Sequence, residues 1–142
     1  AHPGPIVDRE GKVLGQHPGI FNFTVGQRRG IGLAAPKPLY VLEIRARENT
    51  IVVGPNQDLY KAALLAGRLN WIAWPSLDRP LRGTARIRYK HKETDANIIP
   101  LPGEKVSVEF DRPQRAITPG QSVVFYDGDV VLGGGIIEAP LD

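Results

Sequence analysis

Four cationic side chains recur at every second position near the middle of the chain: Arg86, Arg88, Lys90 and Lys92. In a β-strand, successive side chains point to opposite faces, so these four would share one face. At about 3.3 Å per residue they would span about 20 Å, which suits a stretch of phosphate backbone better than a single anion. Charge alone leaves two interpretations open, a nucleic-acid contact or a solvated edge strand that charge protects from pairing.

The residues between these cations point the other way, and Ile87 and Tyr89 are expected to face inward. Near a strand end, however, Tyr89 could stack its ring on a base or donate its hydroxyl to a phosphate. A second basic pair, Arg28 and Arg29, lies between glycines in the loop 24–32. Two guanidinium groups there could bind a phosphate or a carboxylate. The alternative is a structural loop whose arginine pairs with an acidic neighbour.

The segment 115–137 is typical of the last hairpin of a β-barrel. Pro119 and Gly120 bend the chain, and Gln121 places a side chain that both donates and accepts hydrogen bonds beside that bend. The Asp127-Gly128 pair between two apolar runs predicts a tight hairpin. The three glycines at 133–135 interrupt a strand-like pattern, which predicts a bulge or a close backbone approach.

No combination of residues indicates a catalytic centre. The chain has no cysteine, no phosphate-binding loop and no metal-ligand spacing among its three histidines. Neighbouring carboxylates at 93–95 and 127–129 fit turn chemistry. We therefore expect no catalytic residue, metal site or cofactor on this chain. No apolar run is long enough to cross a bilayer, and no signal peptide pattern opens the chain, so we expect a cytoplasmic protein that does not bind membranes.

The charges are unevenly distributed along the chain. The net charge is +3, and the segment 79–92 holds six basic residues and no acidic one. The segment 93–142 holds three basic and nine acidic residues. This segregation predicts a positive patch and a negative region on the folded protein.

Glycine and proline together number 29, and they separate short apolar runs, which is typical of many short strands. We predict a mainly β protein, with a small α/β segment at 1–64 followed by a closed antiparallel β-barrel at 65–142. A helical turn is expected at 59–65. Barrel strands are expected at 69–73, 83–90, 96–101, 105–110, 122–126 and 130–138. The opening Ala1-His2-Pro3-Gly4, in mid-turn and without Met, suggests a fragment of something larger.

Several segments, taken in order, resemble the C-terminal portion of the tRNA-specific 2-thiouridylases. The matching segments cover nearly the whole chain: Gly4-Pro5-Ile6-Val7-Asp8, Gly11-Lys12-Val13-Leu14-Gly15-Gln16-His17, Thr24-Val25-Gly26-Gln27-Arg28-Arg29-Gly30, Tyr40-Val41-Leu42, Arg86-Ile87-Arg88-Tyr89, the run from Arg115 through Thr118-Pro119-Gly120-Gln121 to Tyr126, and Leu132-Gly133-Gly134-Gly135-Ile136-Ile137.

This resemblance implies a parent enzyme that replaces the C2 oxygen of the tRNA wobble uridine with sulfur. ATP, with Mg, adenylates that oxygen, and a cysteine persulfide supplies the sulfur. The ATP loop and both catalytic cysteines would lie in a missing N-terminal catalytic domain, so this fragment alone would be inactive. The barrel would be similar to domain 2 of the elongation factors that deliver aminoacyl-tRNA. The implied partners are tRNA, the missing N-terminal catalytic domain, and a sulfur-relay protein or cysteine desulfurase.

The resemblance also implies which residues contact tRNA: Arg88, Tyr89 and Gln121. The basic face of Arg86, Lys90 and Lys92 supports the same role. Gln27 and Arg28 would be either tRNA contacts or organisers of the interface with the catalytic domain. The alternative function is a protein-interaction barrel that docks a catalytic domain or sulfur-relay partner without touching RNA. The acidic stretch after Glu93 is what indicates this alternative.

Overall fold

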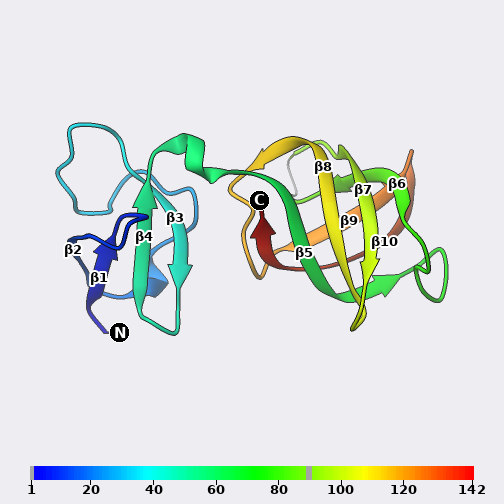
Figure 1. The fold of residues 1–142 in the computed structure, drawn as a ribbon, viewed down its shortest axis with the longest axis horizontal. Coiled ribbons are helices and arrows are strands. Elements are labelled where there is room, and N and C mark those ends of the chain that lie inside the picture. The colour runs from blue at the N-terminus through cyan, green and yellow to red at the C-terminus, as the bar shows by residue number, and fades with distance from the viewer. Residues whose placement is uncertain (1, 89–90) are drawn as a thin grey trace. The chain divides into compact units, whose positions relative to one another are not determined.

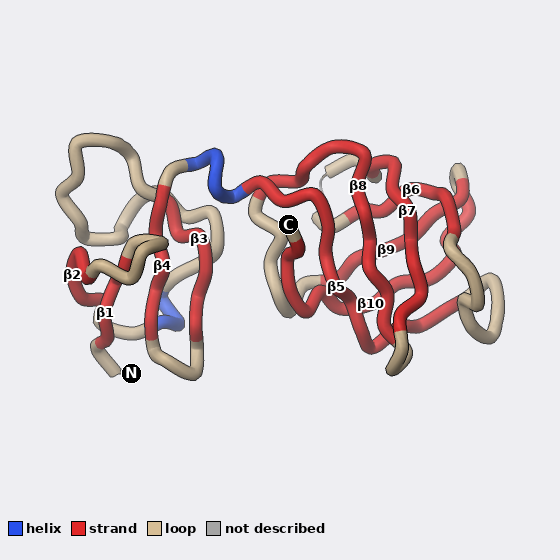
Figure 2. The backbone as a smooth tube through the Cα atoms, viewed as in Figure 1, coloured by secondary structure: helices blue, strands red, loops and turns tan. Residues whose placement is uncertain are grey.

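The computed structural model describes residues 2–88 and 91–142, so Ala1, Tyr89 and Lys90 lie outside the described residues. The chain divides into two compact units, Ala1–Tyr60 and Lys61–Asp142. Sequence alone had suggested a division after Leu64. The regular secondary structure of both units is almost entirely β-strand, joined in the first unit by long loops (Figures 1 and 2). The predicted mainly β fold is confirmed.

The first unit is a four-stranded mixed sheet with the order β2–β1–β4–β3. Its strands are β1 (Gly4–Val7), β2 (Val13–His17), β3 (Tyr40–Arg45) and β4 (Thr50–Gly54). β1 and β4 are parallel, whereas the two outer pairs are antiparallel. Ile6, Val41, Ile51 and Val53 are fully buried and form the core of this unit.

The helical content differs from the expectation. The described residues contain only two short 3-10 turns, η1 (Ile20–Asn22) and η2 (Asn56–Leu59), which are the helical segments in Figure 2. The helical turn expected at 59–65 is wrong, because the twelve-residue strand β5 (Tyr60–Trp71) occupies that segment. Leu64 and Ala66 pair with Pro140 and Ile137 of the last strand. Pairing with a distant strand therefore overrides the helix propensity of alanine and leucine.

The second unit is a closed six-stranded antiparallel barrel, as predicted. Besides β5 it contains β6 (Leu81–Arg86), β7 (Thr94–Leu101), β8 (Lys105–Arg115), β9 (Ser122–Asp127) and β10 (Val130–Leu141). The strand order around the barrel is β10–β5–β8–β7–β6–β9, and β10 closes it by pairing with β9. The predicted hairpin is present, since Asp127 pairs with Val130.

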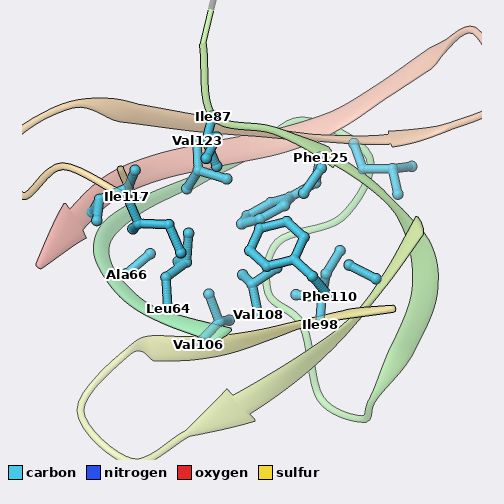
Figure 3. Packing of buried hydrophobic residues seen from close by; sticks show 14 residues of the cluster. Leu64, Ala66, Ile87, Ile98, Val106, Val108, Phe110, Ile117, Val123 and Phe125 are labelled. Atoms are coloured by element: carbon cyan, nitrogen blue, oxygen red, sulfur yellow. The ribbon is translucent and has the colours of Figure 1, made fainter. Parts of the chain in front are cut away.

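The barrel interior is a single apolar cluster to which every strand contributes. Phe125 is fully buried, and the ring of Trp71 stacks on it with the centroids 5.4 Å apart. Figure 3 shows Phe125 and Phe110 in the middle of the cluster, with Ile87 and Ile117 also pointing into it. These two isoleucines anchor the segments that lead into the candidate site.

The glycines at 133–135 allow the close backbone approach that the sequence predicted. A Cβ atom on Gly133, Gly134 or Gly135 would lie 2.5, 2.7 or 2.6 Å from the carbonyl oxygen of Asn70, Val123 or Gly67, respectively. Real Cβ contacts are not this short, so a side chain would push β10 away from its neighbours. The register of β10 also shifts on both sides of the glycines.

Candidate nucleic-acid interface

Most of the residues singled out in the second unit gather at one end of the barrel. Strand β6 ends at Arg86, β7 begins at Thr94, β8 ends at Arg115 and β9 begins at Ser122. Because the strands are antiparallel, these four termini lie at the same end. We call it the basic end, and it carries Arg86, Arg88, Lys92, Arg115 and Gln121.

The predicted alternation of four cations along one strand is wrong. Strand β6 stops at Arg86, and the segment that follows is not a strand in the described residues up to Arg88. The pairing with β7 ends first, because Ala85 already pairs with Thr94, the first residue of β7, and the pairing with β9 ends at Arg86 and Val124. Arg88 and Lys92 therefore lie between β6 and β7 rather than in a strand. Lys90 and Tyr89 lie outside the described residues.

Arg86 lies on the outer face of the barrel, where its guanidinium carbon is 5.4 Å from the centre of the Tyr126 ring. Such a cation–π contact contributes about 0.5–1 kcal/mol at an exposed site. Lys92 is exposed just before β7. Among the described residues, neither Arg86 nor Lys92 has a carboxylate partner, so both charges are available to an anionic ligand.

Arg88 is directed to the backbone that leaves β8. Its Nη2 donates to the carbonyl oxygens of Arg115 and Ala116 at 3.0 and 2.7 Å. Each side of this contact is held by a buried neighbour, Ile87 on one segment and Ile117 on the other (Figure 3). Arg88 and the turn that follows Ala116 are thus brought together although they are far apart in sequence.

Ala116 has an unusual backbone conformation, with a φ of 55°. The left-handed region costs an alanine about 1–2 kcal/mol. Successive carbonyls of a regular strand point in opposite directions, and the left-handed residue allows two of them to face one nitrogen. The hydroxyl of Thr118 also donates to the Ala116 carbonyl, at 2.8 Å. Two side-chain donors therefore converge on one carbonyl oxygen.

The turn 118–121 is tied to β10 by backbone hydrogen bonds. The Gly120 amide donates to the Ile137 carbonyl at 2.8 Å, and the Ile137 amide donates to the Gln121 carbonyl at 2.8 Å. Gly120 has a φ of 91°, which favours glycine. The Gln121 side chain is exposed and has no hydrogen-bond partner among the described residues. The fold thus fixes the backbone of Gln121 and leaves its amide group to solvent.

Gln27 and Arg28 belong to the first unit. The Gln27 side chain accepts a hydrogen bond from the Thr24 amide at 3.0 Å and donates one to the Arg29 carbonyl at 2.8 Å. Both ends of this side chain therefore hold its own loop. Arg28 is exposed, and it lines a groove together with the loop 30–39. Only Arg28 of this pair offers its side chain to a ligand.

The segregation of charge along the sequence is partly cancelled in space. Arg82 forms a two-pronged ion pair with Asp111, which comes from the acidic part of the chain. The hydrogen bond from Arg82 lowers the pKa of the Asp111 carboxyl, and the same bond raises the pKa of Arg82. Lys105 pairs with Glu138, but both residues belong to the acidic segment 93–142. The positive patch is consequently smaller than the basic run of the sequence.

Sequence reasoning missed Thr118 and the two carbonyls that Arg88 contacts. Every residue has a backbone carbonyl, so the residue types at 115 and 116 could not indicate that Arg88 bonds to them. Thr118 had a weak one, since serine and threonine hydroxyls often bond the backbone a few residues away.

Residues 2–88 and 91–142 contain neither a metal-ligand cluster nor a membrane-spanning helix. No group of three or more His, Asp or Glu side chains is placed to hold a metal ion. No helix among them is long and apolar enough to span a bilayer. Buried His17 donates from Nε2 to the Asn49 carbonyl at 2.8 Å, so it acts in the packing of the first unit.

Comparison with known proteins gives matches to both units. Residues 1–55 match a family model described as a tRNA methyl transferase PRC-barrel domain. Residues 61–137 match one described as an aminomethyltransferase beta-barrel domain.

Three curated relatives carry the name tRNA-specific 2-thiouridylase MnmA. The protein from Acetivibrio thermocellus is 55% identical over 96% of this chain, and that from Halothermothrix orenii is 48% identical over 96%. The protein from Symbiobacterium thermophilum is 51% identical over 99%. The chain spans only 36–38% of the length of these relatives.

The fold and the two family models together define the class of protein: a chain with two β domains, a small mixed sheet followed by a six-stranded barrel. The chain belongs to the tRNA-specific 2-thiouridylase family, and it matches the C-terminal domains of its relatives. The relatives match nearly the whole chain at about half identity, so their name carries more weight than the methyl-transfer wording of the two family models.

Proposed function

We propose that this chain is the tRNA-binding part of an enzyme that thiolates C2 of the wobble uridine. The observation that carries the proposal is the basic end, where Arg86, Arg88 and Lys92 have no carboxylate partner among the described residues. The exposed amide of Gln121 adds a group that can donate to and accept from RNA. Relatives named as tRNA-specific 2-thiouridylases support tRNA as the ligand.

Such a surface has a physical purpose in this reaction. An enzyme that acts on a base must pull it from its stack, which costs a few kcal/mol. Contacts with the phosphate backbone elsewhere on the tRNA can offset that cost and fix the register without reading sequence. A closed barrel is a rigid support for contacts of this kind.

The remaining chemistry belongs to the whole protein in this proposal. Residues 2–88 and 91–142 offer no acidic cluster for the magnesium of Mg-ATP. We propose that ATP, the persulfide cysteine and the contact with a sulfur-relay protein or cysteine desulfurase are supplied by other parts of the whole protein. We also propose that it works in the cytoplasm.

The test is tRNA binding to the protein as a function of salt. Replacing Arg86 and Lys92 with glutamine should weaken binding and make the slope of log K against log [salt] less negative by about 0.7–0.9 for each lost phosphate contact. The matched control replaces Arg68 and Arg79 with glutamine. Both arginines are exposed; Arg68 lies in β5, and Arg79 lies in the segment between β5 and β6. Equal losses in both double variants, or no loss in the first, would contradict the proposal.

A second function, docking of a protein, is favoured by exposed apolar side chains at the opposite end of the barrel. Ile72, Val130 and Val131 are 67%, 61% and 40% exposed. The Ile72 amide donates to the Leu132 carbonyl at 2.8 Å, which joins the two segments that carry them. Serine at all three positions should abolish capture of the catalytic domain or a sulfur-relay protein, and it should leave tRNA affinity unchanged.

A further inference from the structure

The Ala116 carbonyl is the meeting point of two side chains from different segments. Arg88 Nη2 lies 2.7 Å and Thr118 Oγ1 lies 2.8 Å from this oxygen. We call this arrangement the Ala116 junction and define it by Arg88, Ala116 and Thr118. Ala116 itself is 2% exposed, so its carbonyl depends on protein donors for most of its hydrogen bonding.

The junction holds a backbone conformation that would not persist alone. An alanine at φ 55° returns to the ordinary region unless its surroundings hold it. Two donors on one carbonyl oppose that change, because rotating the peptide would leave the Thr118 hydroxyl and the buried Ala116 carbonyl unpaired and would break one of the two hydrogen bonds of Arg88. Buried Ile87 anchors the segment that carries Arg88, and buried Ile117 anchors the segment that carries Ala116. The junction therefore fixes the backbone conformation at the start of the turn 118–121.

Thr118 connects the junction to Gln121. Its hydroxyl donates to Ala116, and its own carbonyl accepts the Gln121 amide at 3.3 Å. The Gly120 amide and the Gln121 carbonyl then join the turn to Ile137. A change in the rotamer or hydroxyl of Thr118 is therefore passed to Gln121 through three residues of constrained backbone.

We propose that Thr118 and Arg88 are positioning residues for Gln121. This inference rests on the proposed function in one respect, namely that Gln121 contacts tRNA. Within residues 2–88 and 91–142 Arg88 forms hydrogen bonds only through Nη2, so its Nη1 and Nε hydrogens can donate to a phosphate. Arg88 thus has two separable roles, whereas Thr118 has the positioning role alone.

The first experiment measures the turn without tRNA. In the full-length protein, Thr118→Val should raise amide hydrogen exchange at Gly120 and Ile137 by about tenfold, the change that the loss of one hydrogen bond brings. Thr118→Ser should restore protection, because it keeps the hydroxyl. The matched control is Thr84→Val, the same change at a threonine whose buried hydroxyl has no hydrogen bond among the described residues. It should not raise exchange at either amide.

The second experiment measures tRNA affinity in a double-mutant cycle with Gln121→Ala. Thr118→Val should weaken binding in the wild-type background and have no further effect when Gln121 is already alanine. It should also leave the salt slope unchanged. Arg88→Gln should weaken binding in both backgrounds and reduce the slope, since it removes a charge as well as the junction.

The outcomes separate this inference from the proposed function. Unchanged amide exchange at Gly120 and Ile137 in Thr118→Val and Arg88→Gln would overturn the positioning role, whatever the result of the tRNA-binding experiment. Losses that multiply in the cycle, or a Gln121→Ala variant with wild-type affinity, would overturn it as well. If exchange is faster in Thr118→Val but the wild-type protein does not bind tRNA, the result would support the role of the junction in holding the turn. It would contradict the proposed function instead.

Discussion

The guanidinium of Arg82 in β6 reaches over β7 and binds the carboxylate of Asp111 in β8. On the way its Nη1 passes 3.4 Å from the side-chain oxygen of Asn97 in β7. Three adjacent strands are thus joined by one side chain on the outside of the barrel. The pair is exposed, and its contribution to stability should depend on the charge of Asp111.

The first prediction concerns acid. The pKa of Asp111 is lower in the folded protein than its ordinary 3.8, so the pair stabilises the fold above that value. This stabilisation is lost as the pH falls through the lower, folded pKa. Asp111→Asn should reduce the melting temperature slightly at pH 7, and the difference from wild type should vanish at the acid end of a pH series. The control is Asp129→Asn, in the hairpin turn. A difference in melting temperature between Asp111→Asn and wild type that grows in acid would contradict the prediction.

The second prediction separates the two residues of the first unit. Gln27→Ala removes the two side-chain hydrogen bonds within the loop 24–29, and it should cost about 1–2 kcal/mol. Amide exchange at Thr24 should rise in the same variant. Arg28→Ala should change the free energy of unfolding by less than about 0.5 kcal/mol, because its side chain is exposed. Denaturant unfolding of both variants measures the contrast, and equal losses would show that the Gln27 bonds do not hold the loop.

The third prediction concerns the buried hydroxyl of Thr84, which has no hydrogen-bond partner among the described residues. Burying an unpaired polar atom carries a penalty of about 1–3 kcal/mol. Thr84→Val keeps the shape and removes that penalty, so it should stabilise the barrel by about 1 kcal/mol. Thr84→Ser, which keeps the hydroxyl, should not. A less stable valine variant in thermal unfolding would mean that the hydroxyl is satisfied in solution.

The fourth prediction concerns the glycines of β10. Gly135→Ala would place a Cβ atom 2.6 Å from the Gly67 carbonyl, where backbone rather than a movable side chain stands in the way. We expect a loss of about 1–3 kcal/mol from overpacking. For a domain of this size each kcal/mol lowers the melting temperature by about 4–8 °C. Val131→Ala, at an exposed position of the same strand, should have little effect.

Most of the barrel could be predicted because its signals are local. The Asp127-Gly128 pair, the triple glycine and the alternating apolar runs each specify one element from residues that are adjacent in sequence. The length of β5 could not be predicted, because its alanines and leucines favour a helix and only pairing with β10 makes them a strand. The end of β6 likewise depends on pairing between distant residues, since β7 begins at Thr94, opposite Ala85, and this start is not marked by the residues of β6.

The candidate site was predicted less completely than the fold. The resemblance to the thiouridylases pointed to Arg88 and Gln121, but it gave no reason for the two residues to be connected. Their connection runs through the Ala116 carbonyl and the hydroxyl of Thr118, and a carbonyl is present at every position of every chain. The same limitation applied to Gln27, whose side chain bonds backbone groups of its own loop.

The way Arg88 is held has an evolutionary consequence. Its acceptors are main-chain oxygens, so the side chains at 115 and 116 can be exchanged without breaking the contact. Ala116 could become glycine or asparagine, which tolerate its conformation more readily. A search for pairs of positions that change together would therefore find no correlated partner for Arg88 at 115 or 116. The hydrogen bonds themselves would constrain the side chains of the two donors and not those at 115 and 116, so exchanges at the acceptor positions would leave no record of the bond.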